Sequence, residues 1–384
     1  MTNITNNIAD GTKRQAVEFP SDATNAEKLQ ILLQYAELAP SKYNIQPWVF
    51  EISGDSIDLF CDRHGVLEVA DPDDRELIMS CGAALFNLRV AASCFGYDTT
   101  VQPFPHPGNE CLTARVHLAP RNRPSQPFSP LPAGNRRNGT AARLREFSPS
   151  DEQLLHAIPV RRTYRRKFRL EIPPDNVLAS CQAAAGRNGA WLCRVKDKVT
   201  ERQIAALVAR ADREQMANKL FREEFSMWIR GANKNAKDGM PASAFGLAKC
   251  LNFLTPGLSL LMYSANLGRL MAARDHSLAV NAPVLVVLGT AQDNPEAWLA
   301  AGQAVEAVLL YATVAGLCAS FLNSPIQVNQ IRTRLAQTVA CNGYPQALLR
   351  LGYGKQGPHT PRRPLHEVVV NPTDPASNFR TSLN

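Results

Sequence analysis

The chain has 384 residues, with 42 Lys+Arg against 34 Asp+Glu and a formal net charge of +8 at pH 7. Hydrophobic residues make up 45% and charged residues 20%, a globular composition that excludes general disorder and predicts two or three folding units. We see no apolar run near the roughly 20 residues of a membrane helix and no signal-peptide pattern, so we expect a cytoplasmic protein without a membrane partner. Its nine scattered cysteines include no CxxC pair, so neither a disulfide framework nor a metal site is expected.

The first part of the chain alternates helical and strand patterns. Its predicted elements are a helix over 25–39, strands over 48–52 and 56–60, a helix over 74–95 and a strand over 112–118. Gly54-Asp55 marks a hairpin turn between the first two strands, and Gly96 is a plausible helix C-cap.

Composition then changes. Residues 120–146 contain five prolines and six arginines without an apolar period, which indicates an extended linker. Beyond it we predict helices over 151–158, 174–186, 197–230 and 295–315, and strands over 283–289 and 348–351. The stretch 215–275 is long for the fold proposed below and could equally be a lid or a packed helical insert.

Two apolar segments, CGAALFNLRVAASCFGY and AGQAVEAVLLYATVAGL, repeat one pattern. Gly82 matches Gly302 and Gly96 matches Gly316, both at an offset of 220 residues. Two buried helices could share such periodicity by chance, but matching glycines at one offset favour a duplicated α+β unit. Such a unit could pack against its copy as a dimer does, within a single chain.

Three polar motifs could carry chemistry. In Pro40–Trp48 two prolines hold short polar side chains on a rigid loop, which could bind a planar heterocycle or simply decorate a turn. Arg161–Arg169 has six cations in nine residues, which suits phosphate recognition, a solvated basic face or a nucleic-acid patch. No nucleic-acid module accompanies it, so a nucleic-acid partner is not expected. Pro361-Arg362-Arg363-Pro364 is an anion clamp or a basic tail.

Taken in order, these segments resemble the nitroreductase family of flavoproteins, and within it the tandem-repeat Acg-type branch. The resemblance covers residues 25–370 and implies a nitroreductase-like α+β fold, internally duplicated so that one chain mimics the family homodimer. The expected units are an N-terminal arm over 1–24, a first half over 25–119, a Pro/Arg-rich linker over 120–150, a second half over 151–370 with a candidate lid at 215–275, and a tail over 371–384.

The resemblance also implies an FMN between the two halves. The cofactor-binding residues it implies are Pro40, Ser41, Lys42, Asn44, Gln46, Arg161, Arg162, Thr163, Arg165, Ser324, Pro325, Ile326, Arg362 and Arg363. Candidates for the lid and substrate side are Tyr43, Trp228 and Arg230. The first half lacks a clean copy of the RRTxR motif and the second lacks PSxxN, so we expect one composite site and one FMN per chain.

The function implied is an FMN-dependent oxidoreductase that transfers hydride to or from a small organic substrate, with NAD(P)H as a candidate electron donor. Flavin N5 would carry the chemistry, and no protein side chain is assigned a catalytic role. The alternative is a protein that binds and sequesters FMN with little nitroreductase turnover. The chain would be a monomeric pseudo-dimer or a homodimer.

Overall fold

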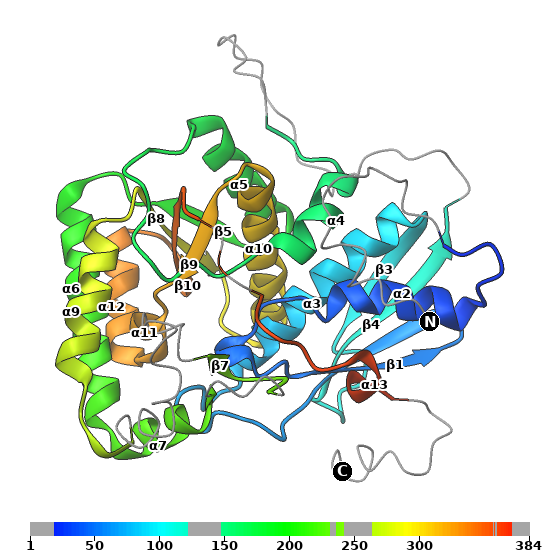
Figure 1. The fold of residues 1–384 in the computed structure, drawn as a ribbon, viewed down its shortest axis with the longest axis horizontal. Coiled ribbons are helices and arrows are strands. Elements are labelled where there is room, and N and C mark those ends of the chain that lie inside the picture. The colour runs from blue at the N-terminus through cyan, green and yellow to red at the C-terminus, as the bar shows by residue number, and fades with distance from the viewer. Residues whose placement is uncertain are drawn as a thin grey trace.

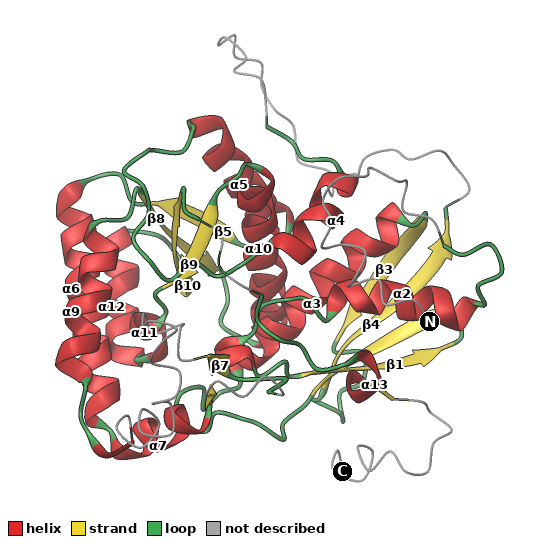
Figure 2. Ribbon diagram, in the orientation of Figure 1, coloured by secondary structure: helices red, strands yellow, loops and turns green. Residues whose placement is uncertain are grey.

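The computed structural model describes residues 19–121, 147–230, 236–241, 263–355, 357 and 359–370. Two β-sheets lie toward opposite ends of its long axis, with the long helices α3 and α10 between them (Figure 1). Figure 2 shows the same arrangement as two separate groups of strands flanked by helices. The expected N-terminal arm, linker and tail fall largely on residues 1–18, 122–146 and 371–384, which lie outside the described residues.

The first sheet has the order β11-β1-β2-β4-β3. Its strands and helices are α2 (Asn25–Ala36), β1 (Trp48–Ser53), β2 (Ser56–Cys61), α3 (Arg75–Cys94), β3 (Tyr97–Pro103), β4 (Leu112–Pro120) and β11 (Val369–Val370). The predicted hairpin is confirmed, with Gly54 at φ +60° in its turn. Strand β3 was not predicted; it forms the edge of the sheet and alternates exposed with half-buried residues.

The second sheet has the order β5-β8-β10-β9. Its elements are α5 (Asp175–Arg187), β5 (Trp191–Arg194), β8 (Val284–Thr290), α10 (Pro295–Val314), β9 (Cys318–Phe321) and β10 (Tyr344–Gly352). Each half therefore runs helix, two strands, long apolar helix and two strands, and in both sheets the fourth strand lies between the second and the third. This shared topology confirms the duplicated α+β fold.

Helices α3 and α10 meet at the two glycines of the repeat. A Cβ built on Gly82 would lie 2.2 Å from the carbonyl oxygen of Leu299, and one built on Gly302 would lie 2.0 Å from that of Met79. Leu299 follows Met79 at the same offset of 220 residues, so the contact is reciprocal, as in a two-fold dimer interface. Glycine is required here because the two backbones touch.

A helical insertion separates β5 from β8. It contains α6 (Lys198–Ala217), α7 (Lys219–Met227), the short strands β6 (Ile229–Arg230) and β7 (Met240–Pro241), and α9 (Gly268–Val280). The prediction of one helix over 197–230 was wrong. The chain breaks at Asn218, whose extended backbone ends α6 and whose side chain caps α7 by accepting from the Leu220 N–H.

Four further helices complete the described chain. They are α4 (Asp151–Val160), α11 (Ser324–Gln327), α12 (Asn329–Val339) and α13 (Leu365–Val368). Of these only α4 was predicted. The short 3-10 turn η1 (Lys42–Asn44) follows α2.

The expectation that no apolar run approaches the length of a membrane helix is corrected by two helices of the structure. Both α3 and α10 are long and apolar enough to cross a membrane by length and composition. Most of each is buried within the protein, where the two helices pack against one another.

Candidate active site

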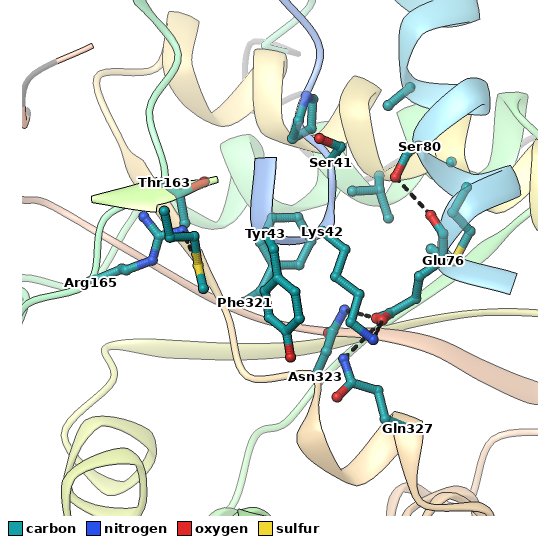
Figure 3. Close-up of a pocket in the computed structure, with 16 residues that line it drawn as sticks. Ser41, Lys42, Tyr43, Glu76, Ser80, Thr163, Arg165, Phe321, Asn323 and Gln327 are labelled. Atoms are coloured by element: carbon teal, nitrogen blue, oxygen red, sulfur yellow. Dashed lines mark hydrogen bonds and ion pairs between the residues drawn. The ribbon is translucent and has the colours of Figure 1, made fainter. Parts of the chain in front are cut away.

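A cavity of about 210 Å³ opens where the two halves meet, and we call it the ring chamber. Met79, Ser80 and Ala83 of α3 and Gly302 and Val305 of α10 form one wall. The loop after α2 supplies part of the rest, and Figure 3 shows Ser41, Lys42 and Tyr43 beside Thr163, Arg165 and Phe321. The chamber therefore draws on both copies of the repeat.

A smaller chamber of about 60 Å³ adjoins it, sharing Pro40, Ser41, Thr163, Arg165 and Met240 as lining residues. Its remaining wall is basic, and we call it the arginine chamber. Among its lining residues are Arg161, Arg162, His359 and Arg362.

The arginine chamber holds more positive charge than its partners offset. Arg161 lies 3.5 Å from Glu306, and Arg162 contacts the His359 ring. Burial and the neighbouring Arg161 lower the pKa of Arg162 to about 10. Among the described residues, the buried Nε atom of Arg162 has no hydrogen-bond partner, and that of Arg161 has only the 3.5 Å ion pair with Glu306. Buried donors without acceptors are costly, so this chamber is suited to an anionic ligand.

Besides lining the arginine chamber, Arg362 holds the loop after α2 in place. It donates to the backbone carbonyls of Glu37, Leu38 and Ala39 and, at 2.9 Å, to Oδ1 of Asn44. Burial and the charges of the other two arginines lower its pKa to about 9. Arg362 thus joins the end of α2 to the arginine chamber.

Arg363, expected beside it, is directed elsewhere. Its guanidinium lies 3.5 Å from Asp62 and 3.7 Å from Asp238, and it is absent from the lining of both chambers. Gln46 is also outside the lining: it is buried, donates to the Lys237 carbonyl and accepts from the Arg363 N–H. Both residues anchor the loop and the C-terminal segment to each other.

The loop itself is strained. Tyr43, Asn44 and Gln46 have φ of 49°, 60° and 58°, a left-handed conformation unusual for side chains of this size. Hydrogen bonds hold it, including one from the Gln46 N–H to Ser41 Oγ at 2.9 Å and one from Asn44 Nδ2 to the Pro361 carbonyl. Strain of this kind persists where the surroundings over-determine it, as at binding sites.

Lys42 pairs with a carboxylate that sequence reasoning missed. Its Nζ lies 2.5 Å from Glu76, and Asn323 and Gln327 donate to the same carboxylate (Figure 3). Burial alone would raise the pKa of Glu76, but Lys42, Arg75 and these hydrogen bonds lower it. The available signal was a charged residue inside an otherwise apolar helix, and Glu306 in α10 is a second case.

The loop expected near the flavin is only partly in place. Asn323 and Gln327 line the ring chamber, whereas Pro325 and Ile326 are buried and Ile326 packs into the core beneath the second sheet. Ser324 lines a third chamber of about 170 Å³, the inner chamber, which shares Tyr43, Arg165, Met240, Phe321, Asn323 and Gln327 with the ring chamber.

The insertion reaches the site through a residue that was not predicted. Trp228 stacks with Arg230, and Arg230 pairs with Asp238 at 2.8 Å; neither lines the three chambers. Met240, twelve residues beyond Trp228, lines all three. Tyr43 lines the ring and inner chambers and packs edge-on against Phe225 of α7, with ring centroids 5.2 Å apart.

Proteins of similar sequence identify the family of this chain. The chain is 30% identical over 359 residues to a Mycobacterium tuberculosis protein whose name assigns it provisionally to the NAD(P)H nitroreductases, covering 91% of this chain and 93% of that one. This chain belongs to the nitroreductase family. It is also 28% identical over 358 residues to the Acg protein of the same organism, covering 91% and 97% of the two chains, so the Acg-type resemblance is confirmed. No protein-family model matches.

Solved structures of other nitroreductase-like proteins cover about half of the chain. One is iodotyrosine deiodinase bound to FMN and 3-iodo-L-tyrosine, with 17% identity, a TM-score of 0.36, and 55% of this chain and 95% of that one covered. Another is the FMN and NADPH-dependent nitroreductase NfnB of Sphigopyxis sp. strain HMH, with 17% identity, a TM-score of 0.37 and coverage of 56% and 97%.

Proposed function

We propose that this nitroreductase-family protein is an FMN-dependent oxidoreductase that transfers hydride between FMN and a small organic substrate, with NADH or NADPH as electron donor. The observation that carries the proposal is the joined pair of chambers, in which a partly apolar cavity leads to a second chamber lined by Arg161, Arg162 and Arg362. FMN has the matching shape and charge, because a flat ring system ends in an anionic phosphate.

The residues present fit this cofactor. Arg161, Arg162 and Arg362 line the arginine chamber, where their positive charges would bind the phosphate. Met79, Ala83 and the loop after α2 would enclose the ring. When bound, FMN would supply the hydride chemistry. Arg165 lines the ring chamber and would favour negative charge there, whereas the charge of Lys42 is offset by Glu76.

We further propose one FMN per chain. Ala83 lines the ring chamber, and its counterpart at the repeat offset of 220 is Gln303. Arg89 donates to Gln303 at 2.7 Å and approaches Asn188 at 3.5 Å, so larger polar side chains occupy the related place. A second flavin would have to displace this cluster.

An FMN-sequestering role is the second candidate. It is favoured by Met240, through which the insertion contributes a lining residue to all three chambers. An enclosed flavin would leave little room for a nicotinamide. This candidate predicts tight FMN binding without reduction by NADH or NADPH.

The test is a titration of flavin-free protein with FMN, followed by anaerobic addition of NADH or NADPH. Binding at one flavin per chain and bleaching of its absorbance are expected. Binding without bleaching, when dithionite still reduces the flavin, would favour sequestration. No binding, or two flavins per chain, would contradict the proposed site.

Arg162 of the RRTxR motif and Arg363 of the C-terminal motif provide a test variant and its control. Arg162→Ala should weaken FMN binding, because a charge-assisted contact contributes about 1.5–3 kcal/mol, or about tenfold or more in Kd. Arg363→Ala should leave the Kd much less affected, because that side chain pairs with Asp62 and Asp238 outside the chambers. Equal losses in both variants would refute the assignment of the phosphate to the arginine chamber.

A further inference from the structure

The inner chamber extends the ring chamber into the insertion. Helices α6, α7 and α9 supply much of its wall, and it shares Tyr43, Phe321 and Arg165, which are labelled in Figure 3, with the ring chamber. A molecule bound against the ring could therefore place one end among residues that belong to the insertion.

Half of the residues that line the inner chamber are apolar or aromatic, and this part of the wall suits an aromatic group. Tyr43, Phe221, Phe225 and Phe321 line the chamber, and the Phe221 and Phe225 rings stack with centroids 6.0 Å apart. Three methionines, Met216, Met240 and Met271, complete the apolar surface. Aromatic rings and thioether sulfurs pack favourably against a flat conjugated ligand.

One carboxylate in this wall is left without a counter-charge. Asp212 of α6 is only 4% exposed, and although Ser324 hydrogen-bonds its carboxyl group, its Oδ2 has no partner among the described residues. The nearby Asp275 differs, because Arg274 lies 3.4 Å from it. Burying a carboxylate without a partner is costly, so a ligand that brings a cationic nitrogen would satisfy it.

The other charges around Asp212 do not supply that partner. Asp275 and Arg274 of α9 and Arg213 of α6 act on it only through their fields, and among the described residues it makes no salt bridge. Burial, with the Asp275 charge, raises the pKa of Asp212 to about 7. Arg274 is already engaged with Asp275 and with the Arg165 carbonyl.

We propose that the inner chamber selects small arylalkylamines, holding the protonated alkylamine nitrogen against Asp212 and the ring between the phenyl and methionine side chains. The proposal rests on the proposed function, because the adjoining ring chamber would hold the flavin that reacts with the bound molecule. The geometry favours this cationic class of substrate over neutral and anionic aromatic molecules.

Three probes with one ring system test the charge preference: tryptamine (cationic), 3-methylindole (neutral) and indole-3-acetate (anionic). Each is titrated at pH 7.5 into FMN-loaded protein, and the perturbation of the flavin absorbance gives Kd. Tryptamine should bind about tenfold or more tightly than 3-methylindole, as expected for one charge-assisted contact, and indole-3-acetate should bind most weakly. Equal binding of the three, or tightest binding of indole-3-acetate, would overturn the proposal.

Asp212→Asn should abolish the preference for tryptamine while leaving FMN binding unchanged, because the arginine chamber does not include this residue. The matched control is Glu214→Gln, which removes an exposed carboxylate from the same helix and should keep the preference. A preference that survives in Asp212→Asn would overturn the assignment. The wild-type series decides the ligand class even if the variant folds poorly.

The failure of this proposal is distinguishable from that of the proposed function. If FMN does not bind, the proposed function fails at the first titration. The three probes are then compared by their shift of Tm in flavin-free protein, which still reports whether the chamber prefers the amine.

Discussion

The contact between the two repeated glycines makes a strong prediction about stability. In Gly302→Ala the new methyl group would lie 2.0 Å from the Met79 carbonyl oxygen, whereas ordinary contact begins at 3.4 Å. Relief would require α3 and α10 to separate locally by more than 1 Å. The two helices pack closely along their buried faces, so the separation would loosen the centre of the core.

The expected loss follows from two opposing effects. Overpacking a close contact costs about 1–3 kcal/mol, and the rigid backbone here places the cost near the upper end. Alanine regains about 1 kcal/mol of helix propensity over glycine. The free energy of unfolding should therefore fall by about 2 kcal/mol. Because Gly302 and Met79 both line the ring chamber, FMN binding should weaken as well.

Urea denaturation followed by circular dichroism measures this loss. The matched control is Gly186→Ala in α5, where an added Cβ meets nothing within 4 Å, so stability should stay constant or rise by about 0.5–1 kcal/mol. If Gly302→Ala were as stable as the wild type, the two backbones could not be in contact and the reasoning would fail.

Three other outcomes follow from the buried charges and the insertion. Lys42→Met should lower the free energy of unfolding in urea by about 3 kcal/mol, because Glu76 loses the nearer of its two counter-ions and keeps only Arg75 at 3.8 Å. Lys42→Met/Glu76→Gln should recover part of the loss, and a double variant no more stable than the single one would contradict this. Burial raises the pKa of Glu37 to about 8 although Arg362 opposes the rise, so folded protein keeps a proton that unfolded protein releases above pH 4.5. Stability should fall from pH 5 to 8 by at most about 1.4 kcal/mol per pH unit from this group, and Glu37→Gln should remove that contribution in urea unfolding at each pH; an unchanged slope would refute it. Met240→Ala should increase iodide quenching of bound FMN, and unchanged quenching would show that the insertion does not cover the flavin.

The sequence predicted the long buried elements well because their signals are local and strong. The glycines at one offset indicated the duplication, and Gly54 marked the hairpin turn. The four-residue strands β5 and β9 were missed because short strands carry too few residues for a period-two pattern. The seven-residue edge strand β3 was missed because none of its residues is fully buried, so its apolar alternation is weak. Their place in a sheet depends on neighbours far along the chain.

The site was harder to predict because neighbouring residues of one type take different directions. Arg362 faces the arginine chamber and Arg363 faces Asp62. Which of the two side chains points into the chamber depends on the direction of the backbone, which the two adjacent arginines do not reveal in the sequence. Trp228 was the expected lining residue from the insertion, but Met240 lines the chambers, because the path of the insertion backbone turns that side chain toward them. Glu76 was missed because nothing in its own segment identifies Lys42, 34 residues earlier in the chain, as its partner.

The pairing of β11 with β1 has a consequence for biosynthesis. Phe50 is in register with Val369, and Arg362 binds the carbonyl of Glu37 across 325 residues of sequence. The first half therefore leaves the ribosome long before the strand that completes its sheet and the arginine that holds its loop have been translated. Assembly of the cofactor-binding cleft becomes a post-translational event that waits for nearly the whole chain, and a product truncated before residue 362 would lack it.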